Sequence, residues 1–289
     1  MTSLFSFLSV TWDVNPVIFH IFGRGIRWYG LLWGLAFVVG YRIFEKIVKR
    51  EDLPTKVLES IFWYTVVATV FGAKLGHYLF YEPAEFFDHP FRALFLEWQG
   101  GFASHGAAIG ILIGLWLFSW KNKLPYVWSL DRIGIVVASG GALIRLGNLM
   151  NSEIYGTPTD LPWGFIFVRN GETVPMHPTQ LYEALAYLVL FGVLYYLYFK
   201  KDLVRKRPGV MFGIFLIVLF VARFFIEFVK NPQVAFEESM ALDMGQWLSV
   251  PFIVAGIVIL ALALRRSPMP VPAPKPASVP KTAPGCKKK

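Results

Sequence analysis

Long apolar stretches, separated by short polar segments, run through most of the chain. A window of about 19 residues, the length commonly used to find membrane-crossing helices, identifies seven of them. Their approximate limits are 25–43, 57–80, 101–120, 131–150, 180–199, 209–229 and 246–264. Each is close to the roughly 20 residues that a helix needs to cross a hydrocarbon core. The pattern therefore predicts an all-α integral membrane protein with about seven transmembrane helices.

Basic residues gather in alternate connecting segments. Arginines and lysines follow the first, third, fifth and seventh stretches, and the group after the third includes Lys121, Lys123 and Arg132. The other connections are mainly acidic. Because loops rich in Arg and Lys stay on the cytoplasmic side, the N-terminus is predicted to face outward and the C-terminus inward.

Two segments differ from the helical pattern. Residues 151–178 are rich in turn residues and contain one strand-like run at 163–168, which predicts a small outward-facing cap between helices 4 and 5. Residues 267–289 consist mostly of proline, alanine and lysine, which predicts a disordered cytoplasmic tail. The chain is thus expected to comprise a membrane domain at 1–266, which includes the cap, and the tail.

Composition agrees with a membrane protein. The chain is 55% hydrophobic, 17% aromatic and 16% charged, whereas soluble domains are about 45 to 50% apolar. The net charge of +9 comes largely from the basic loops and the tail, so it indicates attraction to anionic headgroups and not nucleic-acid binding. Cys286 is the single cysteine, which excludes a disulfide framework. No metal- or nucleotide-binding motif is present, so no cofactor is expected.

Several ionisable or polar side chains lie inside the apolar stretches, where a charge costs roughly 2.5 to 3.5 kcal/mol. At about 1.5 Å per residue, Arg145 and Arg223 lie roughly 20 Å from the inner face and Lys74 roughly 25 Å. His105 and Tyr29 enter from the outer side. Five helices are therefore expected to bring polar side chains into one outer layer. Two arginines beside a histidine indicate a site that binds an anion and acts on it.

Helical spacing groups the neighbours of the two arginines. Arg145 shares a face with Asn148 and Ser152, at i, i+3 and i+7, and has no acidic partner on its own helix. Arg223 shares a face with Glu227 and Lys230. Glu227 is expected to hold Arg223 in place, although the two could also be a purely structural ion pair.

Five motifs of the chain, in order, resemble those of the bacterial prolipoprotein diacylglyceryl transferase family. They are Arg27-Trp28-Tyr29-Gly30, Ser104-His105-Gly106, the run from Gly141 to Gly156, the run from His177 to Glu183, and the run from Arg223 to Phe228. Three positions depart from the family pattern. Ser152 stands where glycine is usual, Ala107 where a second glycine is common, and Lys74 where arginine is usual.

The resemblance implies an enzyme that moves the diacylglyceryl group of phosphatidylglycerol to the lipobox cysteine of a prolipoprotein, forming a thioether and releasing glycerol phosphate. Its implied partners are phosphatidylglycerol, the prolipoprotein signal peptide and membrane lipid. It implies a place in the bacterial cytoplasmic (inner) membrane, with the active site toward the periplasm. The implied catalytic residues are His105, Arg145 and Arg223. The implied substrate-binding residues are Tyr29, Lys74, Asn148, Asn151, Glu153, Gly156, His177 and Glu227.

Two alternatives stay open. His177 competes with His105 for the role of general base, or else braces the cap. A carrier or flippase for an anionic lipid or solute would also place arginines in a cavity. A carrier is expected to have ionisable groups toward both leaflets, whereas those placed by the sequence lie in the outer half, which favours an enzyme.

Overall fold

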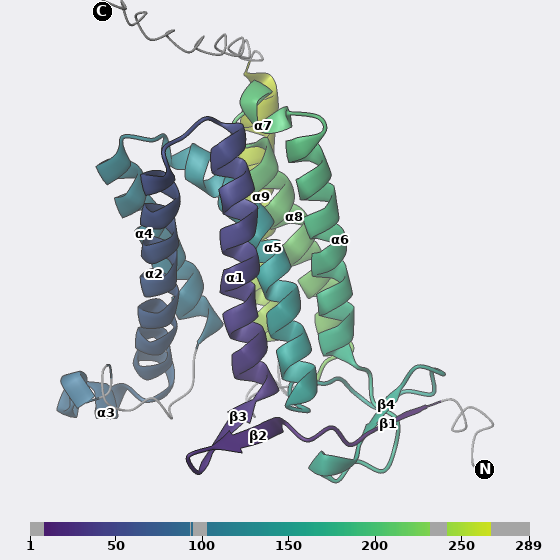
Figure 1. Cartoon of the computed structure of the whole chain (residues 1–289). Helices are drawn as coiled ribbons and strands as arrows, with labels where there is room; N and C mark the ends of the chain where they lie inside the picture. The colour runs from purple at the N-terminus through teal and green to yellow at the C-terminus, as the bar shows by residue number, and fades with distance from the viewer. Residues whose placement is uncertain (1–8, 93, 95–102, 232–241, 267–289) are drawn as a thin grey trace, which may run out of the picture.

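Seven long helices run side by side in the computed structural model, which describes residues 9–92, 94, 103–231 and 242–266 (Figure 1). Each has at least 18 residues, or about 27 Å of helix, which is close to the thickness of a hydrocarbon core. The long helices are α1 (Trp28–Arg50), α2 (Thr55–Tyr81), α4 (Ser104–Asn122), α5 (Tyr126–Met150), α6 (Thr179–Phe199), α8 (Val210–Glu227) and α9 (Met244–Arg265).

Short elements occupy the two ends of this bundle. The strands lie at one end, here called the cap end, and α7 lies at the other, here called the basic end (Figure 1). The short elements are β1 (Val10–Trp12), β2 (Val17–Ile21), β3 (Arg24–Arg27), β4 (Phe165–Phe167), α3 (Pro83–Asp88), α7 (Leu203–Lys206) and a 3-10 turn at Val168–Asn170. β1 pairs with β4 in parallel and β2 pairs with β3 in antiparallel fashion.

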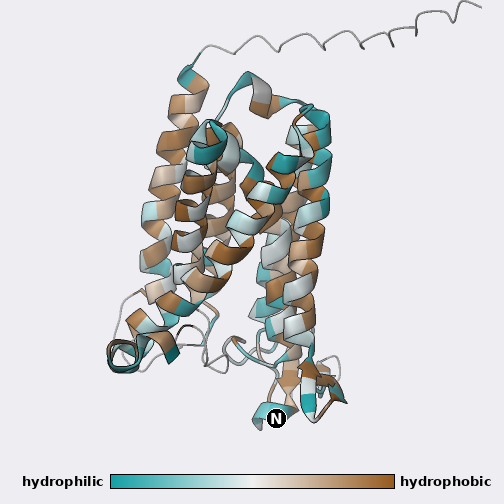
Figure 2. Cartoon of the chain, turned by 60° about the vertical axis from the view of Figure 1, so that its left-hand side comes forward, coloured by the Kyte–Doolittle hydropathy of each residue, from teal (hydrophilic) through white to brown (hydrophobic). Residues whose placement is uncertain are grey.

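The helices confirm the predicted all-α membrane fold. Five of them, α2, α5, α6, α8 and α9, are long and apolar enough to cross a membrane. Figure 2 shows the apolar residues along the shafts of the helices and polar residues gathered toward both ends. α1 is not among them because its last turns carry several charges, among them Arg42, Lys46 and Lys49. The predicted count of seven crossings therefore stays a prediction for α1 and α4.

Glycines allow α2 and α4 to pack closely. A Cβ atom on Gly76 would lie 2.6 Å from the Cα of Gly106, and one on Gly72 would lie 2.5 Å from the Gly106 carbonyl oxygen. Small residues at such crossings let helix backbones approach in lipid, where van der Waals contact replaces the hydrophobic effect between helices. The glycines of α4, together with its polar residues, also lower its mean hydropathy. This explains why α4 is not among the five helices that are clearly apolar enough to cross a membrane.

The basic end contains a buried ionic network that corrects one sequence expectation. Arg132 was expected in a cytoplasmic loop, but it lies inside α5, is 4% exposed and donates to Glu51 at 2.7 and 3.0 Å. Trp128 and Tyr198 also donate to Glu51. Asp131, fully buried, accepts the backbone N–H groups of Gly209 and Phe212 at the start of α8. α5 therefore begins earlier than its apolar stretch, because partners from other helices satisfy its charges.

The cap is built from two distant parts of the chain. The strand-like run predicted at 163–168 is confirmed as β4, which also bridges to Met176. Its other partner, β1, comes from the N-terminal segment, and Trp12 donates its indole N–H to the Leu149 carbonyl at 3.1 Å. The sequence pattern did not predict β1, β2 or β3. The predicted tail at 267–289 lies outside the described residues.

Candidate active site

Polar residues of five helices meet at the cap end. Tyr29 and His105 lie in the first turns of α1 and α4, Glu183 in the second turn of α6, and Arg145 and Arg223 in the last two turns of α5 and α8. These positions follow from chain direction, because α5 and α8 end where α1, α4 and α6 begin. Of the five side chains that helix depth placed in one layer, Tyr29, His105, Arg145 and Arg223 lie at this end together with Glu183, and Lys74 lies about two turns before the end of α2.

Arg145 is held by a buried carboxylate on another helix. Its Nε atom lies 2.5 Å from Oε2 of Glu183, and the two side chains are 13% and 0% exposed. An Nη atom of Arg145 also donates to Asn148 at 3.2 Å, and Tyr187 interacts with the guanidinium. An arginine in an apolar helix needs such partners, since an unpaired buried charge is costly. The guanidinium is thus fixed in one orientation.

Lys230 links Glu183 to Glu227. Its Nζ lies 3.8 Å from Glu183 and 3.3 Å from Glu227, and the lysine is 4% exposed. Burial lowers the pKa of Lys230, and the two carboxylates act in the opposite direction. The Glu227 carboxyl also lies against Gly245, in the first turn of α9, where a Cβ atom would be 2.5 Å from it. A carboxylate is favourable at such a helix N-terminus.

The described contacts do not include the predicted pairing of Glu227 with Arg223. Glu227 pairs with Lys230 instead. Arg223 is half-buried and makes no hydrogen bond or ion pair with another residue that the structure describes. It interacts electrostatically with His105, Tyr187 and Lys230. Its guanidinium is therefore available to an anion in a way that the paired Arg145 is not.

A chain of amides connects Arg145 to the cap. Asn148, 5% exposed, donates to Glu153 at 2.8 Å, and Asn151 donates to the same carboxylate oxygen at 3.2 Å. Tyr29 interacts electrostatically with both Glu153 and Arg145, and its ring packs against Gly147. The predicted residues Tyr29, Asn148, Asn151 and Glu153 are thus brought together beside Arg145.

His177 has a well-defined place in the cap. Its Nδ1 lies 3.1 Å from the hydroxyl of Tyr182, which also accepts the indole N–H of Trp163 at 3.0 Å. Its backbone pairs with Gly156 and Thr157. Partial burial lowers the pKa of His177. These contacts match the bracing role, and none of them joins His177 to Arg145 or Arg223.

Two other predicted site residues are enclosed by protein. Gly156 has no room for a side chain, since a Cβ atom would lie 2.8 Å from both His177 and Thr179 and against the Val229 carbonyl. Packing alone accounts for this glycine. Lys74 is 2% exposed, with its Nζ 5.6 Å from the centre of the Tyr78 ring.

Ser152, one of the departures from the family pattern, stands at a position whose backbone favours glycine. It has a φ of 56°, in the left-handed region that favours glycine, and it is 2% exposed. Its hydroxyl has no hydrogen-bond partner among the described residues. The chain therefore carries a strained serine directly after α5.

The sequence placed the buried ionisable groups in the outer half of the membrane domain, and this prediction is wrong. Glu51, Asp131 and Arg132 are buried or nearly so at the basic end, so ionisable groups lie toward both ends of the bundle. They were missed because Arg132 looked like a loop residue. They bind one another and the start of α8, but their presence removes the argument from asymmetry for an enzyme over a carrier.

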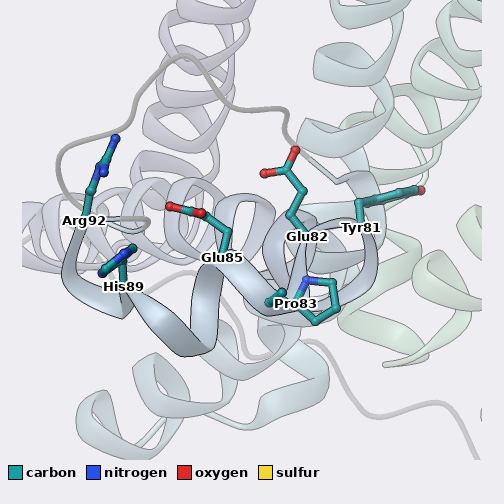
Figure 3. Close-up of a pocket in the computed structure, with 7 residues that line it drawn as sticks. Tyr81, Glu82, Pro83, Glu85, His89 and Arg92 are labelled. Atoms are coloured by element: carbon teal, nitrogen blue, oxygen red, sulfur yellow. The ribbon is translucent and has the colours of Figure 1, made fainter.

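An apolar cavity adjoins the polar layer. It has a volume of about 330 Å³ and lies between α1, α2, α4 and α5, with Tyr29 and Ser104 at the cap end and Phe44 and Leu58 farther along. A second hollow, at the end of α2, is lined by Tyr81, Glu82, Pro83, Ala84, Glu85, His89 and Arg92 (Figure 3). None of the predicted site residues lines that second hollow, whereas Tyr29 lines the first.

Glu183 is the functional candidate that the sequence analysis missed. It stands within the motif from His177 to Glu183, five residues into an apolar helix, at the same depth as Arg145. A carboxylate there requires a cation from another helix. A carboxylate in one apolar helix and an arginine without an acidic partner in another would together have predicted the pair of Glu183 and Arg145.

Comparison with known proteins gives a consistent result. The family model described as "Prolipoprotein diacylglyceryl transferase" matches residues 16–262. A phosphatidylglycerol--prolipoprotein diacylglyceryl transferase of Porphyromonas gingivalis is 45% identical over 271 residues, which cover 89% of this chain and 95% of the relative. Proteins of the same name from Tolumonas auensis and Bacteroides fragilis are each 42% identical, covering 88% and 86% of this chain and 98% and 94% of the relatives.

Proposed function

Because this chain belongs to the prolipoprotein diacylglyceryl transferase family, we propose that it transfers the diacylglyceryl group of phosphatidylglycerol to the thiol of a prolipoprotein cysteine. It is a membrane-embedded transferase of lipoprotein biosynthesis. The observation that carries the proposal is the arrangement of Arg145 and Arg223 at the cap end, next to an apolar cavity. A phospholipid needs both a cationic place for its phosphate and an apolar place for its chains.

The two arginines have different roles in this proposal. Arg223, without an ion-pair partner among the described residues, binds the phosphodiester. Arg145, oriented by Glu183 and Asn148, supplies a second guanidinium at a fixed position. Both stabilise the charge that develops on the departing phosphate, which is worth most when the donors are held in place before the reaction.

The chemical step exchanges two bonds. A carbon–sulfur bond forms between the cysteine thiolate and the glyceryl carbon, and the bond from that carbon to the phosphate oxygen breaks, its electron pair leaving with glycerol phosphate. A thiol of pKa about 8.5 is only a few per cent ionised at neutral pH, so a base assists the reaction. His105 is the better candidate, because it lies near Arg223, whereas His177 is engaged with Tyr182.

The proposal includes a substrate route and an orientation. The cysteine is the lipobox cysteine that follows a hydrophobic signal peptide, and that peptide lies beside the helices in the membrane. The protein resides in the bacterial inner membrane with seven crossings. Its N-terminus and cap end face the periplasm, and the basic end faces the cytoplasm, in line with the positive-inside rule.

A reconstituted transfer assay tests the proposal. Purified protein is mixed with phosphatidylglycerol labelled in its diacylglycerol part and with a lipobox-type cysteine peptide, and the peptide is read by mass spectrometry. A diacylglyceryl mass increment is expected on the cysteine peptide and not on its serine counterpart. Arg145→Ala and Arg223→Ala should insert normally and lose transfer. Full activity in either would refute its role at the phosphate.

The same assay separates the alternatives. His105→Gln should lower the maximal rate far more than His177→Gln, and the reverse order would exchange their roles. A carrier would instead redistribute labelled lipid between the leaflets of proteoliposomes without modifying the peptide. That outcome would overturn the transferase proposal.

A further inference from the structure

The hairpin of β2 and β3 is a two-stranded ribbon with one apolar face. Its register pairs Phe19 with Ile26 and Ile21 with Arg24. Paired residues share a face, and alternate residues of a strand point to opposite faces. Phe19, Ile21 and Ile26 therefore lie on one face together with Arg24, and they are 50%, 46% and 36% exposed. The opposite face carries His20 and Arg27 together with Val17.

The tip of the hairpin extends this apolar face. Phe22 and Gly23 form the turn, with φ values of 49° and 75°. Two successive positive φ values favour Asn-Gly or Gly-Gly, and a bulky residue in that region is strained. Phe22 is nevertheless an aromatic residue and is fully exposed, at 101%. An aromatic residue kept in a strained and exposed position points to a contact outside the fold.

The hairpin is fixed at the boundary of the apolar helices. β3 ends at Arg27 and α1 begins at Trp28, whose N–H donates to the Pro16 carbonyl at 3.0 Å. Figure 1 shows the hairpin projecting sideways from the foot of α1, away from β1 and β4. Among the described helices, α1 makes the main contact with the hairpin, through β3. A lone two-stranded hairpin is at best marginally stable in water, so a further surface is needed.

We propose that the hairpin at residues 17–27 lies on the outer leaflet and binds anionic phospholipid there. The apolar face and Phe22 enter the acyl region, and Arg24 contacts the lipid phosphate. Charge supports this partner, since the other described segments at the cap end carry Glu82, Glu85, Asp88, Glu153 and Asp160 against Arg92 and Arg169. The hairpin is thus a basic patch on a mainly acidic end. It would gather lipid next to Tyr29, a consequence that rests on the proposed function.

Spin labelling measures the depth of the hairpin without requiring activity. Cys286→Ser removes the single cysteine of the chain, and Phe22→Cys then carries the label in proteoliposomes of phosphatidylglycerol and phosphatidylcholine. Collision with oxygen, and not with a water-soluble nickel chelate, is expected at this position. Asp160→Cys, on the exposed part of the cap, is the control that should favour nickel. Phe19→Cys gives a second reading if the tip variant folds poorly.

Three results would overturn the proposed contact. One is a label at Phe22 that behaves like the one at Asp160. Another is spin–spin broadening, which would show that a second copy covers the hairpin. The third is a label that becomes protected only when a signal peptide is added, which would make the peptide the partner.

The role of Arg24 is tested through lipid selectivity. One basic residue near an anionic surface is worth about a five-fold change in binding, so Arg24→Gln should raise the KM for phosphatidylglycerol about five-fold and leave kcat unchanged. Arg169→Gln, an exposed arginine of the cap paired with Asp13, is the matched control and should change neither. An unaltered KM in Arg24→Gln would refute anionic-lipid binding. A wild-type protein without transfer would instead refute the proposed function, while the spin-label result would still decide the position of the hairpin.

Discussion

Removing the carboxylate of Glu183 is the sharpest test of how Arg145 is held. Glu183→Gln keeps the shape of the side chain but leaves Arg145, 13% exposed, without the charge that lies 2.5 Å from its Nε. Removing one partner of a buried ion pair costs about 3 to 5 kcal/mol. Lys230 also loses a carboxylate at 3.8 Å but keeps Glu227 at 3.3 Å. We therefore expect a loss near the lower limit, about 3 kcal/mol in the free energy of unfolding.

Denaturant unfolding in detergent micelles, followed by circular dichroism, measures this loss. Asp160→Asn removes an exposed carboxylate at the same end and should change stability by less than about 0.5 kcal/mol. The double variant Arg145→Gln/Glu183→Gln should be more stable than Glu183→Gln alone, because no charge remains uncompensated, yet it should not transfer lipid. A Glu183→Gln protein as stable as the wild type, or a double variant no more stable than the single one, would refute the ion-pair reasoning.

Three further predictions concern packing, strain and pH. Gly106→Ala should lower the free energy of unfolding by about 2 to 3 kcal/mol through overpacking, because its Cβ atom would lie 2.7 Å from the Gly76 Cα. Gly192→Ala, with open space around it, is the control, and equal unfolding midpoints of the two variants would contradict the expectation. Ser152→Gly should stabilise the protein by about 1 kcal/mol, measured in the same unfolding assay, since it relieves a positive φ and removes a buried hydroxyl without a described partner; a less stable variant would disprove it. Burial lowers the pKa of His177, so the folded cap favours the neutral imidazole. The stability that His177 contributes is therefore present above its unfolded pKa of about 6.5 and is lost as pH falls through the lower folded pKa. Protease sensitivity of the cap should rise over that range in the wild type and less steeply in His177→Gln; parallel profiles would contradict it.

Local pattern predicted the helices of this fold well and their surroundings poorly. Runs of apolar residues give α2, α5, α6, α8 and α9 directly, because a helix in lipid satisfies its own backbone. Glycines four residues apart, such as Gly72 and Gly76, are typical of close helix packing, and α2 and α4 do pack closely there. Gly30 and Gly34 have the same spacing, but no described atom lies within 4 Å of where their Cβ atoms would be. Spacing alone does not say which face of a helix meets a neighbour.

The strands show the opposite case. β1 has three residues, and its partner β4 lies more than 150 residues away in the chain. No window of sequence contains both, so their pairing was not predictable from local pattern. The β2–β3 hairpin has a Gly in its turn, but Phe22 replaces the residues that usually announce a two-residue turn.

Within the site, helix depth predicted the layer but not the partners. Tyr29, His105, Arg145 and Arg223 were placed at one end from residue counts along their helices. Which carboxylate meets which cation depends on how the helices rotate about their axes, and sequence distance does not contain that. Glu227 was therefore assigned to Arg223, which lies four residues before it. The contact that forms is with Lys230, three residues after it.

The charges of the site also bear on how the reaction ends. Arg145 and Lys230 pair with Glu183 and Glu227, and Arg223 adds a positive charge without an ion-pair partner among the described residues, so these five side chains carry one excess positive charge. A phosphodiester brings one negative charge and makes the group neutral. A phosphate monoester carries about −1.5 to −2 at neutral pH, so the released glycerol phosphate would leave the group with excess negative charge. In the proposed reaction the same residues therefore attract the departing phosphate more strongly than the lipid phosphodiester, which favours cleavage of the carbon–oxygen bond and opposes release of glycerol phosphate.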